Sequence, residues 1–343
     1  MPEKKSLTKF STLFCILVLF SSTTFANTGE SFTAYIENDT RRIGGPGSDE
    51  NYSSGVRFSY TYAEDRIPNW APILTDWSQN LQNEFDKSST NFGLSLGHQI
   101  YTPKDTRTEE FILDDRPYAA WLYLGLSASF QTETHNHSLE LDIGIVGPAA
   151  LGEQVQNNFH SMIDVEQAKG WKHQLDNEPT LQLSYQQRLR FIEIENHGSK
   201  IVDVIPYFGG AFGNVLIGGH GGAIMRLGYN IPDDYGPTRP SATDGEPVFI
   251  PRANRDPEHW GAYIYGGLRG NAVLHNIFLD GSIFRPSHHV SKYIVNGESE
   301  FGLGAHYNGW SMVWRYVTKS PEFKERNSSN SFASVTLSFS QDL

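Results

Sequence analysis

Cysteine is almost absent from this sequence, and its absence removes several kinds of chemistry. Cys15 is the only cysteine in 343 residues, and it lies in an apolar N-terminal run that we expect to be cleaved off. Without it the chain has no disulfide, no thiol nucleophile and no cysteine-ligated metal. The fold must then gain its stability from another source.

The first residues have the pattern of an export signal. Three lysines precede an apolar run over residues 10–20, and a stretch of small and polar residues follows and ends at Ala26. This run falls short of the roughly 20 residues that a membrane-spanning helix needs, so a membrane anchor is the less favoured alternative. We therefore predict a signal peptide at 1–26 and a single domain at 27–343.

Basic residues and long apolar runs are scarce as well. The formal net charge is −12, and it becomes −14 when the three lysines and one glutamate of residues 1–26 are removed. An acidic chain without clustered Lys and Arg lacks the phosphate contacts that DNA and RNA require, so we expect no nucleic-acid partner. No segment after Ala26 approaches 18 continuous apolar residues, which excludes a helical membrane protein.

Alternation of apolar and polar residues is abundant. Val56, Phe58 and Tyr60, for example, alternate with polar residues, which is the pattern of a strand with one apolar and one polar face. The segments of this kind that we predict as strands are 31–39, 55–63, 90–101, 118–131, 137–147, 179–193, 201–213, 221–230, 259–273, 298–307, 310–319 and 332–340. A continuation of the ninth strand through 276–281 is left open.

Segments of this length favour one class of membrane protein. About ten alternating residues per segment, aromatic residues near many strand ends, abundant glycine and an export signal are together typical of an outer-membrane β-barrel. A secreted soluble β-sandwich is the alternative, although it tends to carry disulfides and needs no aromatic girdles. We predict an all-β fold, a twelve-stranded antiparallel transmembrane β-barrel of the bacterial outer membrane, with a short helix in an extracellular loop.

One segment breaks the strand pattern. Residues 149–163 have helical spacing, and Pro148 stands just before them, as suits a helix N-terminus. Gln156 and His160 lie one turn apart on one face of this helix. The apolar stripe on another face consists of Val155, Phe159 and Met162. A helix inside a strand-to-strand connection is often functional.

The strand order brings several polar segments to one end of the barrel. If the N-terminus is periplasmic, the connections 40–54, 102–117 and 148–178 are all extracellular. The acidic strand tip at residues 37–39 then meets the predicted helix at this rim, which makes the rim the candidate site. Two connections at the periplasmic end are longer than turns need to be: 64–89 and 231–258.

The residue types at this rim suit metal-assisted ester hydrolysis. His160 could act as a general base near neutral pH. Asn38, Asp39 and Glu166 offer the hard oxygens that Ca²⁺ prefers, and such an ion would polarise an ester carbonyl. The plainer interpretation is that these carboxylates only solvate a strand tip. Other schemes lack their motifs, because the sequence has no G-x-S-x-G, H-E-x-x-H or Walker-type stretch.

Several longer stretches carry a resemblance to a known family. They are IENDTRR, DENYSSG, HQIYTPKD, DDRPYAAWLYLG, GIVGPAALGEQVQNNFH, KGWKHQLDNEP, DVIPYFGGAFGN and HNIFLDG. In these stretches, and in their order along nearly the whole chain, the sequence resembles the outer-membrane lipid A 3′-O-deacylase family. The resemblance implies a twelve-stranded barrel with its site between the wall and an outer-loop helix. It also implies Ca²⁺-dependent hydrolysis that removes the 3′ acyloxyacyl group of lipid A, in the manner of phospholipase A2.

The resemblance further implies roles for four catalytic and metal-site residues. His160 would activate the attacking water. Asn38 and Asp39 would stand at the metal and oxyanion end, and Glu166 would be a further metal-site or orienting carboxylate.

Four more positions relate to the family pattern. Gln156 matches the glutamine of the family's helix, and Ser53 stands where a member of the family has Thr, which keeps a hydroxyl. The family pattern has adjacent Lys and Arg in the second outer loop, suited to the phosphates of lipid A. Here Lys104 and Arg107 are the basic residues at hand for substrate binding.

Three functions remain open on these grounds. The first is an ester hydrolase acting on lipid A of the lipopolysaccharide in the outer leaflet, and the second is the same chemistry on a glycerophospholipid. The third is a non-catalytic channel or structural barrel, whose lumen would hold inward polar residues such as Arg57 and Glu140. Glu37 should point to the opposite face from Asn38, because neighbouring residues of a strand alternate.

Overall fold

The computed structural model describes residues 30–38, 51–63, 89–239, 247, 259–326 and 329–341. The strands are β1 (Glu30–Asn38), β2 (Asn51–Thr61), β3 (Ser89–Thr102), β4 (Ala119–Gln131), β5 (His135–Val146), β6 (Glu178–Leu189), β7 (Ile192–Asn196), β8 (Ser199–Gly213), β9 (Leu216–Tyr229), β10 (Gly261–Asn276), β11 (Val295–Tyr307), β12 (Trp310–Lys319) and β13 (Asn330–Gln341). The helices are η3 (Pro148–Ala150), α3 (Gly152–Ile163), η4 (Gly170–His173) and α4 (Ile277–Asp280). The predicted signal peptide lies outside the described residues.

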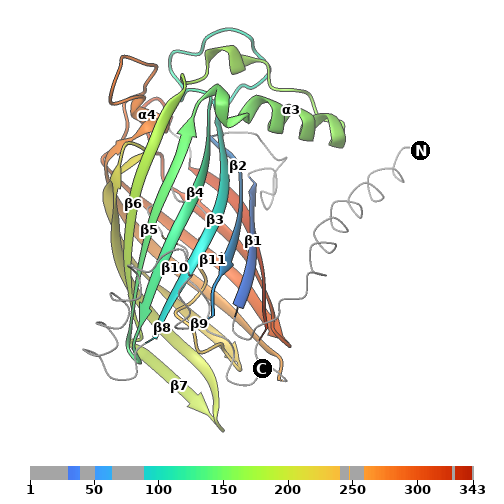
Figure 1. Cartoon of the computed structure of the whole chain (residues 1–343), viewed down its shortest axis with the longest axis vertical. Helices are drawn as coiled ribbons and strands as arrows, with labels where there is room; N and C mark the ends of the chain where they lie inside the picture. The colour runs from blue at the N-terminus through green and yellow to red at the C-terminus, as the bar shows by residue number, and fades with distance from the viewer. Residues whose placement is uncertain are drawn as a thin grey trace.

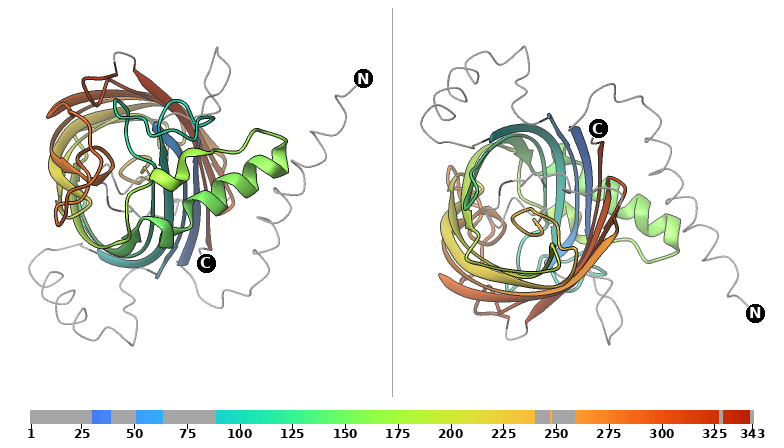
Figure 2. Two further views of the ribbon diagram at one scale, coloured as in Figure 1. Left: turned by 90° about the horizontal axis from the view of Figure 1, so that it is seen from above. Right: turned by 90° about the horizontal axis from the view of Figure 1, so that it is seen from below.

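Twelve of the strands close into an antiparallel barrel (Figures 1 and 2). Each strand pairs with its sequence neighbour, β1 pairs with β13, and β6 pairs with β8 to complete the ring. The short strand β7 pairs only with β8 and extends beyond one end of the barrel. No helix among the described residues is long and apolar enough to cross a membrane.

The strands predicted from alternation are confirmed, with ends that differ by up to five residues, as in β9, which begins at Leu216 and not at residue 221. Two segments differ in kind. The sixth strand ends at Leu189, and residues Ile192–Asn196 form the separate strand β7. The continuation of the ninth strand through 276–281 is wrong, because Ile277–Asp280 form the helix α4. The Asn276 side chain accepts a hydrogen bond of 3.0 Å from the backbone N–H of Phe278, and this cap ends the strand and starts the helix.

Charged side chains fill the lumen, as the inward positions predicted. Arg57 of β2 and Glu140 of β5 form a buried ion pair across the barrel interior. Arg226 of β9 forms a two-pronged contact with Asp203 of β8, at 2.9 Å and 2.5 Å. The outward positions carry apolar residues instead, such as Leu124. A barrel wall that is apolar outside and polar inside is what a membrane-spanning sheet requires.

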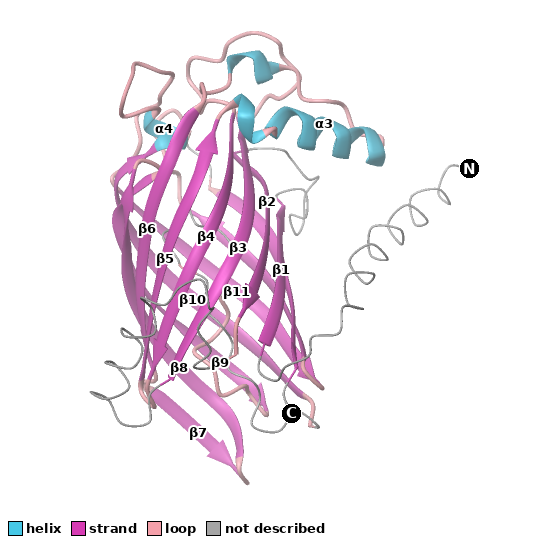
Figure 3. Ribbon diagram, in the orientation of Figure 1, coloured by secondary structure: helices cyan, strands magenta, loops and turns pink. Residues whose placement is uncertain are grey.

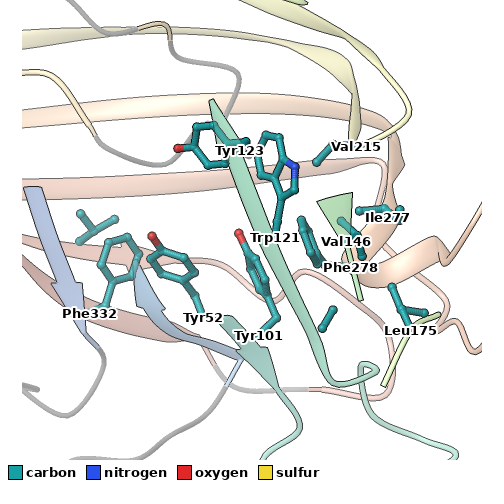
Figure 4. Close-up of a cluster of buried hydrophobic side chains, with 12 residues drawn as sticks. Tyr52, Tyr101, Trp121, Tyr123, Val146, Leu175, Val215, Ile277, Phe278 and Phe332 are labelled. Carbon is teal, nitrogen blue, oxygen red and sulfur yellow. The ribbon is translucent and has the colours of Figure 1, made fainter. Parts of the chain in front are cut away.

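A cluster of buried side chains, here called the aromatic cluster, fills the lumen at the end where the described helices lie (Figure 4). Its members are Tyr52, Tyr101, Ala119, Trp121, Tyr123, Val146, Leu175, Val215, Ile277, Phe278, Val317 and Phe332. The rings of Tyr101 and Phe278 stack with centroids 4.0 Å apart, and those of Trp121 and Tyr123 with centroids 4.1 Å apart. Phe278 comes from α4, so the connection between β10 and β11 folds inward over the barrel mouth. The described residues therefore close this mouth with packed side chains.

The connection after β9 enters the lumen from the opposite end. Arg188 donates hydrogen bonds of 2.9 Å and 3.0 Å to the carbonyls of Tyr235 and Pro237, and Arg315 donates one of 2.9 Å to the carbonyl of Thr238. Tyr235 is fully buried. Part of the long connection 231–258 therefore forms an internal plug over residues 231–239, which accounts for some of its unexplained length.

All helices of the described residues lie at one end of the barrel (Figure 3). The connections between β3 and β4 and between β5 and β6 meet there, since the backbone N–H of Lys169 bonds the carbonyl of Thr106 at 2.9 Å. The prediction that strand parity gathers these loops at one rim is confirmed for the described residues.

Candidate active site between the barrel wall and helix α3

Helix α3 lies outside the wall with one stripe turned toward it. Gly152, Gln156 and His160 are spaced four residues apart, so they share one helix face. All three are buried although the helix stands on the outer surface of the barrel (Figure 1). The helix packs against β3 and β4. The predicted pair Gln156 and His160 therefore faces the wall.

The N-terminus of α3 is set by a break in the backbone. Pro148 opens the 3₁₀ turn η3, where its missing N–H costs nothing. Leu151 then takes a left-handed conformation with φ of 61°, and the α-helix begins at Gly152. The predicted helix 149–163 is confirmed, with this one break inside its first turn.

Glycine allows the helix and the segment after it to approach the wall closely. A Cβ on Gly152 would stand 2.4 Å from the Cβ of Ala120 and 2.5 Å from the Trp171 ring. A Cβ on Gly170 would stand 2.4 Å from the Tyr118 ring. The apolar cluster under the helix consists of Ile100, Tyr118, Ala120, Ala150, Ala168 and Trp171. Helix and wall are thus in direct contact.

His98 of β3 anchors the start of the helix. Its Nε2 is 2.8 Å from the backbone carbonyl of Ala150, and a carbonyl only accepts, so Nε2 is the donor. Residues 98, 100 and 102 alternate onto the outer face of β3. This row runs from beneath the helix to the tip of the strand, where the second half of the site begins.

The surroundings of His160 fix its tautomer. Its Nδ1 lies 2.7 Å from the backbone carbonyl of Glu166, and because the carbonyl can only accept, the proton resides on Nδ1. The neutral ring then has its lone pair on Nε2. His160 is 4% exposed. A histidine held in this way is arranged to accept a proton at Nε2.

Trp171 fixes the orientation of the Gln156 amide. The indole Nε1–H donates to Oε1 of Gln156 at 2.9 Å, and since an indole can only donate, the amide oxygen must face it. The amide nitrogen then points the other way. This Nε2 is buried and has no hydrogen-bond partner among the described residues. A buried N–H₂ group in this state is a ready donor for a ligand oxygen.

Asn38, Ser53 and Thr102 meet at the tips of β1, β2 and β3. The Asn38 amide donates to the carbonyl of Ser53 at 3.2 Å, and the hydroxyls of Ser53 and Thr102 lie 2.6 Å apart. A register shift between Tyr52 and Ser54 places an extra residue here, so Ser53 leaves the regular alternation. Thr102 lies two residues beyond Ile100 on the outer face of β3, which links this polar group to the cluster under α3.

Glu37 lies on the other face of β1. It is fully buried, and the hydroxyl of Tyr52 donates to its Oε2 at 2.6 Å. The expectation that Glu37 and Asn38 point to opposite faces is confirmed, and Glu37 is a lumen residue.

Glu166 contributes its backbone, not its side chain, to the contact with His160. Its carboxylate is exposed and pairs with Lys169 at 2.8 Å. The hydrogen bond and positive charge of Lys169 lower the pKa of the Glu166 carboxyl, and the carboxylate in turn raises the pKa of Lys169. In this arrangement the positive charge of Lys169 balances the negative charge of the Glu166 carboxylate.

The two basic residues predicted for substrate binding lie in the loop after β3. Lys104 is exposed, and its backbone N–H bonds the Asp115 carboxylate at 2.7 Å. Arg107 has a 74% exposed side chain, whose Nε lies 3.6 Å from the carboxylate of Asp105. Asp39, predicted as a metal ligand, lies outside the described residues. Among the residues that are described, no three His, Cys, Asp or Glu side chains gather as a metal site.

Comparison with known proteins places the chain in a family. The family model described as outer membrane protein LpxR matches residues 12–341. The chain belongs to the LpxR family. No curated protein sequence matches it.

Two solved structures illustrate how far the likeness to this fold extends. LpxR from Salmonella typhimurium has a TM-score of 0.72 at 20% identity, covering 90% of this chain and 99% of that one, which shows a shared fold. The beta domain of the Bordetella autotransporter Brka covers 92% of this chain and 99% of its own, at 10% identity and a TM-score of 0.44.

Sequence reasoning missed three contributors to the site of this LpxR-family chain. His98 has no ligand-like spacing in the sequence, although its outward position on β3 follows from the alternation of that strand. Trp171 lies within the stretch KGWKH that carries the family resemblance, yet its contact with the helix depends on how the connection folds back. Thr102 meets Ser53 only because of the register shift in β2, which the sequence does not signal.

Proposed function

We propose that this LpxR-family protein removes the 3′ acyloxyacyl group of lipid A by ester hydrolysis, acting at the extracellular rim of the outer membrane. The observation that carries the proposal is His160, buried between a helix and the barrel wall with its lone pair on Nε2. The outer leaflet is where lipid A resides, and the outer face of the wall is open to that leaflet. The ester and its position come from the family resemblance.

The reaction follows from the groups present. Nε2 of His160 takes a proton from water as the water oxygen attacks the acyl carbonyl carbon. The amide N–H₂ of Gln156, turned away from Trp171, donates to the oxygen on which negative charge develops. The tetrahedral intermediate then collapses, the ester C–O bond breaks, and the protonated His160 returns its proton to the sugar oxygen. The products are a carboxylic acid and a free hydroxyl.

The donor chemistry at the strand tip fits Ca²⁺. Asn38 and Asp39 offer amide and carboxylate oxygens, which this cation takes as ligands. Glu166 is a further candidate ligand, with a carboxylate that Lys169 now neutralises. When bound, the ion would supply positive charge to the ester carbonyl oxygen. Lys104 and Arg107, both exposed on the loop after β3, are the proposed contacts for lipid A phosphates.

The test is mass spectrometry of lipid A from Gram-negative cells that express the protein. Loss of one acyloxyacyl mass in the wild type, but not in His160→Ala, supports the proposal. His289→Ala is the matched control, because His289 is exposed in the connection between β10 and β11. Folding of each variant is checked by the gel-mobility shift that folded barrels show on boiling. Unchanged lipid A in cells with a folded wild-type barrel would refute the proposal.

A further inference from the structure

Helix α3 carries an exposed apolar stripe that the site does not use. The stripe consists of Val155, Phe159 and Met162 of the helix together with its N-cap residue Leu151, with exposed fractions of 47%, 39%, 38% and 50%. At 100° per residue, it is turned by roughly a quarter of a circle from the buried stripe that faces the wall. A surface helix rarely leaves four large apolar residues in a row open to water.

The opposite side of the helix is polar and is covered by its own connection. The Asn157 amide donates to the carbonyl of Ala168 at 3.1 Å and accepts from its N–H at 2.8 Å, and the Gln167 amide donates to the Ser161 hydroxyl at 2.8 Å. In Figure 1 the chain leaving α3 returns above the helix, on the side away from the strands. The polar stripe therefore faces away from the strands, and the apolar stripe faces toward the end at which the strands of the barrel lie.

The apolar stripe continues the lipid-facing surface of the wall. The outward row of β4 runs from Ala120, buried under the helix, through Leu122, which packs against the cluster beneath it. It continues to Leu124 and Leu126, with exposed fractions of 64% and 41%. Seen from above, α3 projects sideways beyond the outline of the barrel (Figure 2).

We infer that α3 lies in the membrane surface, with the stripe from Leu151 to Met162 inserted among the acyl chains of the lipids around the barrel. Its polar side, with the connection that covers it, then faces the headgroups, which is the arrangement of an interfacial amphipathic helix. The helix holds Gln156 and His160. Its position in the membrane surface therefore sets the depth in the lipid layer at which an ester can reach these two side chains. The inference depends on the membrane location of the barrel and not on ester hydrolysis, so its test needs no activity.

Fluorescence quenching by brominated lipid tests this arrangement. In a chain carrying Cys15→Ser, single cysteines replace Val155 or Phe159 on the stripe, and Glu153→Cys is the matched control on the far side of the helix. Each is labelled with bimane and reconstituted into phosphatidylcholine vesicles whose acyl chains carry bromine. We expect loss of most of the emission at 155 and 159, and little loss at 153.

Three results would overturn the inference. Equal quenching at all three positions would show that the helix has no apolar side turned toward the acyl chains, and no quenching at 155 and 159 would show that the stripe is not among them. Efficient disulfide cross-linking between copies of Val155→Cys or of Phe159→Cys, without quenching, would show that a second copy covers the stripe. Because a label can disturb the helix, Val155→Trp is measured in the same lipids against the wild-type emission, with each protein first shown to be a folded barrel by its mobility shift on boiling.

Discussion

Two hydrogen bonds decide which atoms His160 and Gln156 present to a substrate. The Glu166 carbonyl holds the proton of His160 on Nδ1, and the Trp171 indole holds the oxygen of the Gln156 amide. The carbonyl can only accept a hydrogen bond and the indole N–H can only donate one, so the proton position of His160 and the amide orientation of Gln156 are both fixed. In the proposed reaction, the wall side of α3 would therefore offer one base and one donor.

Removal of the base has the largest expected effect. His160→Gln keeps a side chain of similar size but offers no nitrogen that accepts a proton at neutral pH. We expect the rate of lipid A hydrolysis to fall by about 10²–10⁴-fold, the usual contribution of a general base. The rate is measured with purified protein in detergent. A variant that stays folded and retains more than a tenth of the activity would contradict the assigned role.

Trp171 is a positioning residue in this scheme. Trp171→Phe removes the N–H that orients Gln156, so the amide can turn over and lose its donor. We expect about a tenfold loss of kcat, the scale of one hydrogen bond, with little change in KM. In Gln156→Ala the same tryptophan substitution should cost almost nothing more. Additive losses in the double variant would show that Trp171 acts by packing alone.

The Glu166 and Lys169 pair tests the proposed Ca²⁺ site. If the carboxylate binds the ion, Lys169 competes with it, so Lys169→Ala should lower the Ca²⁺ concentration that gives half-maximal activity. We expect a change of about two- to fivefold, since the pair is exposed and screened by solvent. Glu166→Gln should shift the requirement in the opposite direction. No shift in either variant would remove the Glu166 carboxylate from the site.

Among the elements, α3 depends most on contact with the wall. Gly152→Val would place side-chain atoms into Ala120 and Trp171, which stand 2.4 Å and 2.5 Å from a Cβ at this position. We expect the helix to leave the wall and hydrolysis to be lost, while the barrel still shows its mobility shift on boiling. Gly270→Ala in β10 is the matched control, since its Cβ meets nothing within 4 Å. Full activity of Gly152→Val would contradict this docking.

The sequence predicted helices and strands correctly wherever apolar and polar residues follow a periodic pattern. Alternation found the barrel strands, and the spacing of Gln156 and His160 placed both on one face of α3, although it did not show that this face is buried. The plug at residues 231–239 and the helix α4 could not be found in this way. The plug has no period, because lumen arginines hold its backbone carbonyls, and α4 depends on a single capping side chain.

The whole barrel is closed at both ends among the described residues. The aromatic cluster fills one mouth, and the plug occupies the lumen at the other. We therefore expect no stable ion conductance in planar lipid bilayers, which argues against the channel hypothesis. Removal of the plug's anchors in Arg188→Ala with Arg315→Ala should produce intermittent openings. Steady conductance through the wild-type protein would contradict a sealed lumen.

One assay distinguishes the remaining functions most directly. Purified protein in detergent micelles is given lipid A and a glycerophospholipid in parallel, each with Ca²⁺ or with EDTA. We predict that mass spectrometry finds lipid A shortened by one acyloxyacyl group with Ca²⁺, no product with EDTA or His160→Gln, and an intact glycerophospholipid. Release of fatty acid from the glycerophospholipid alone, or from neither lipid by the folded protein, would contradict the assignment as a lipid A deacylase.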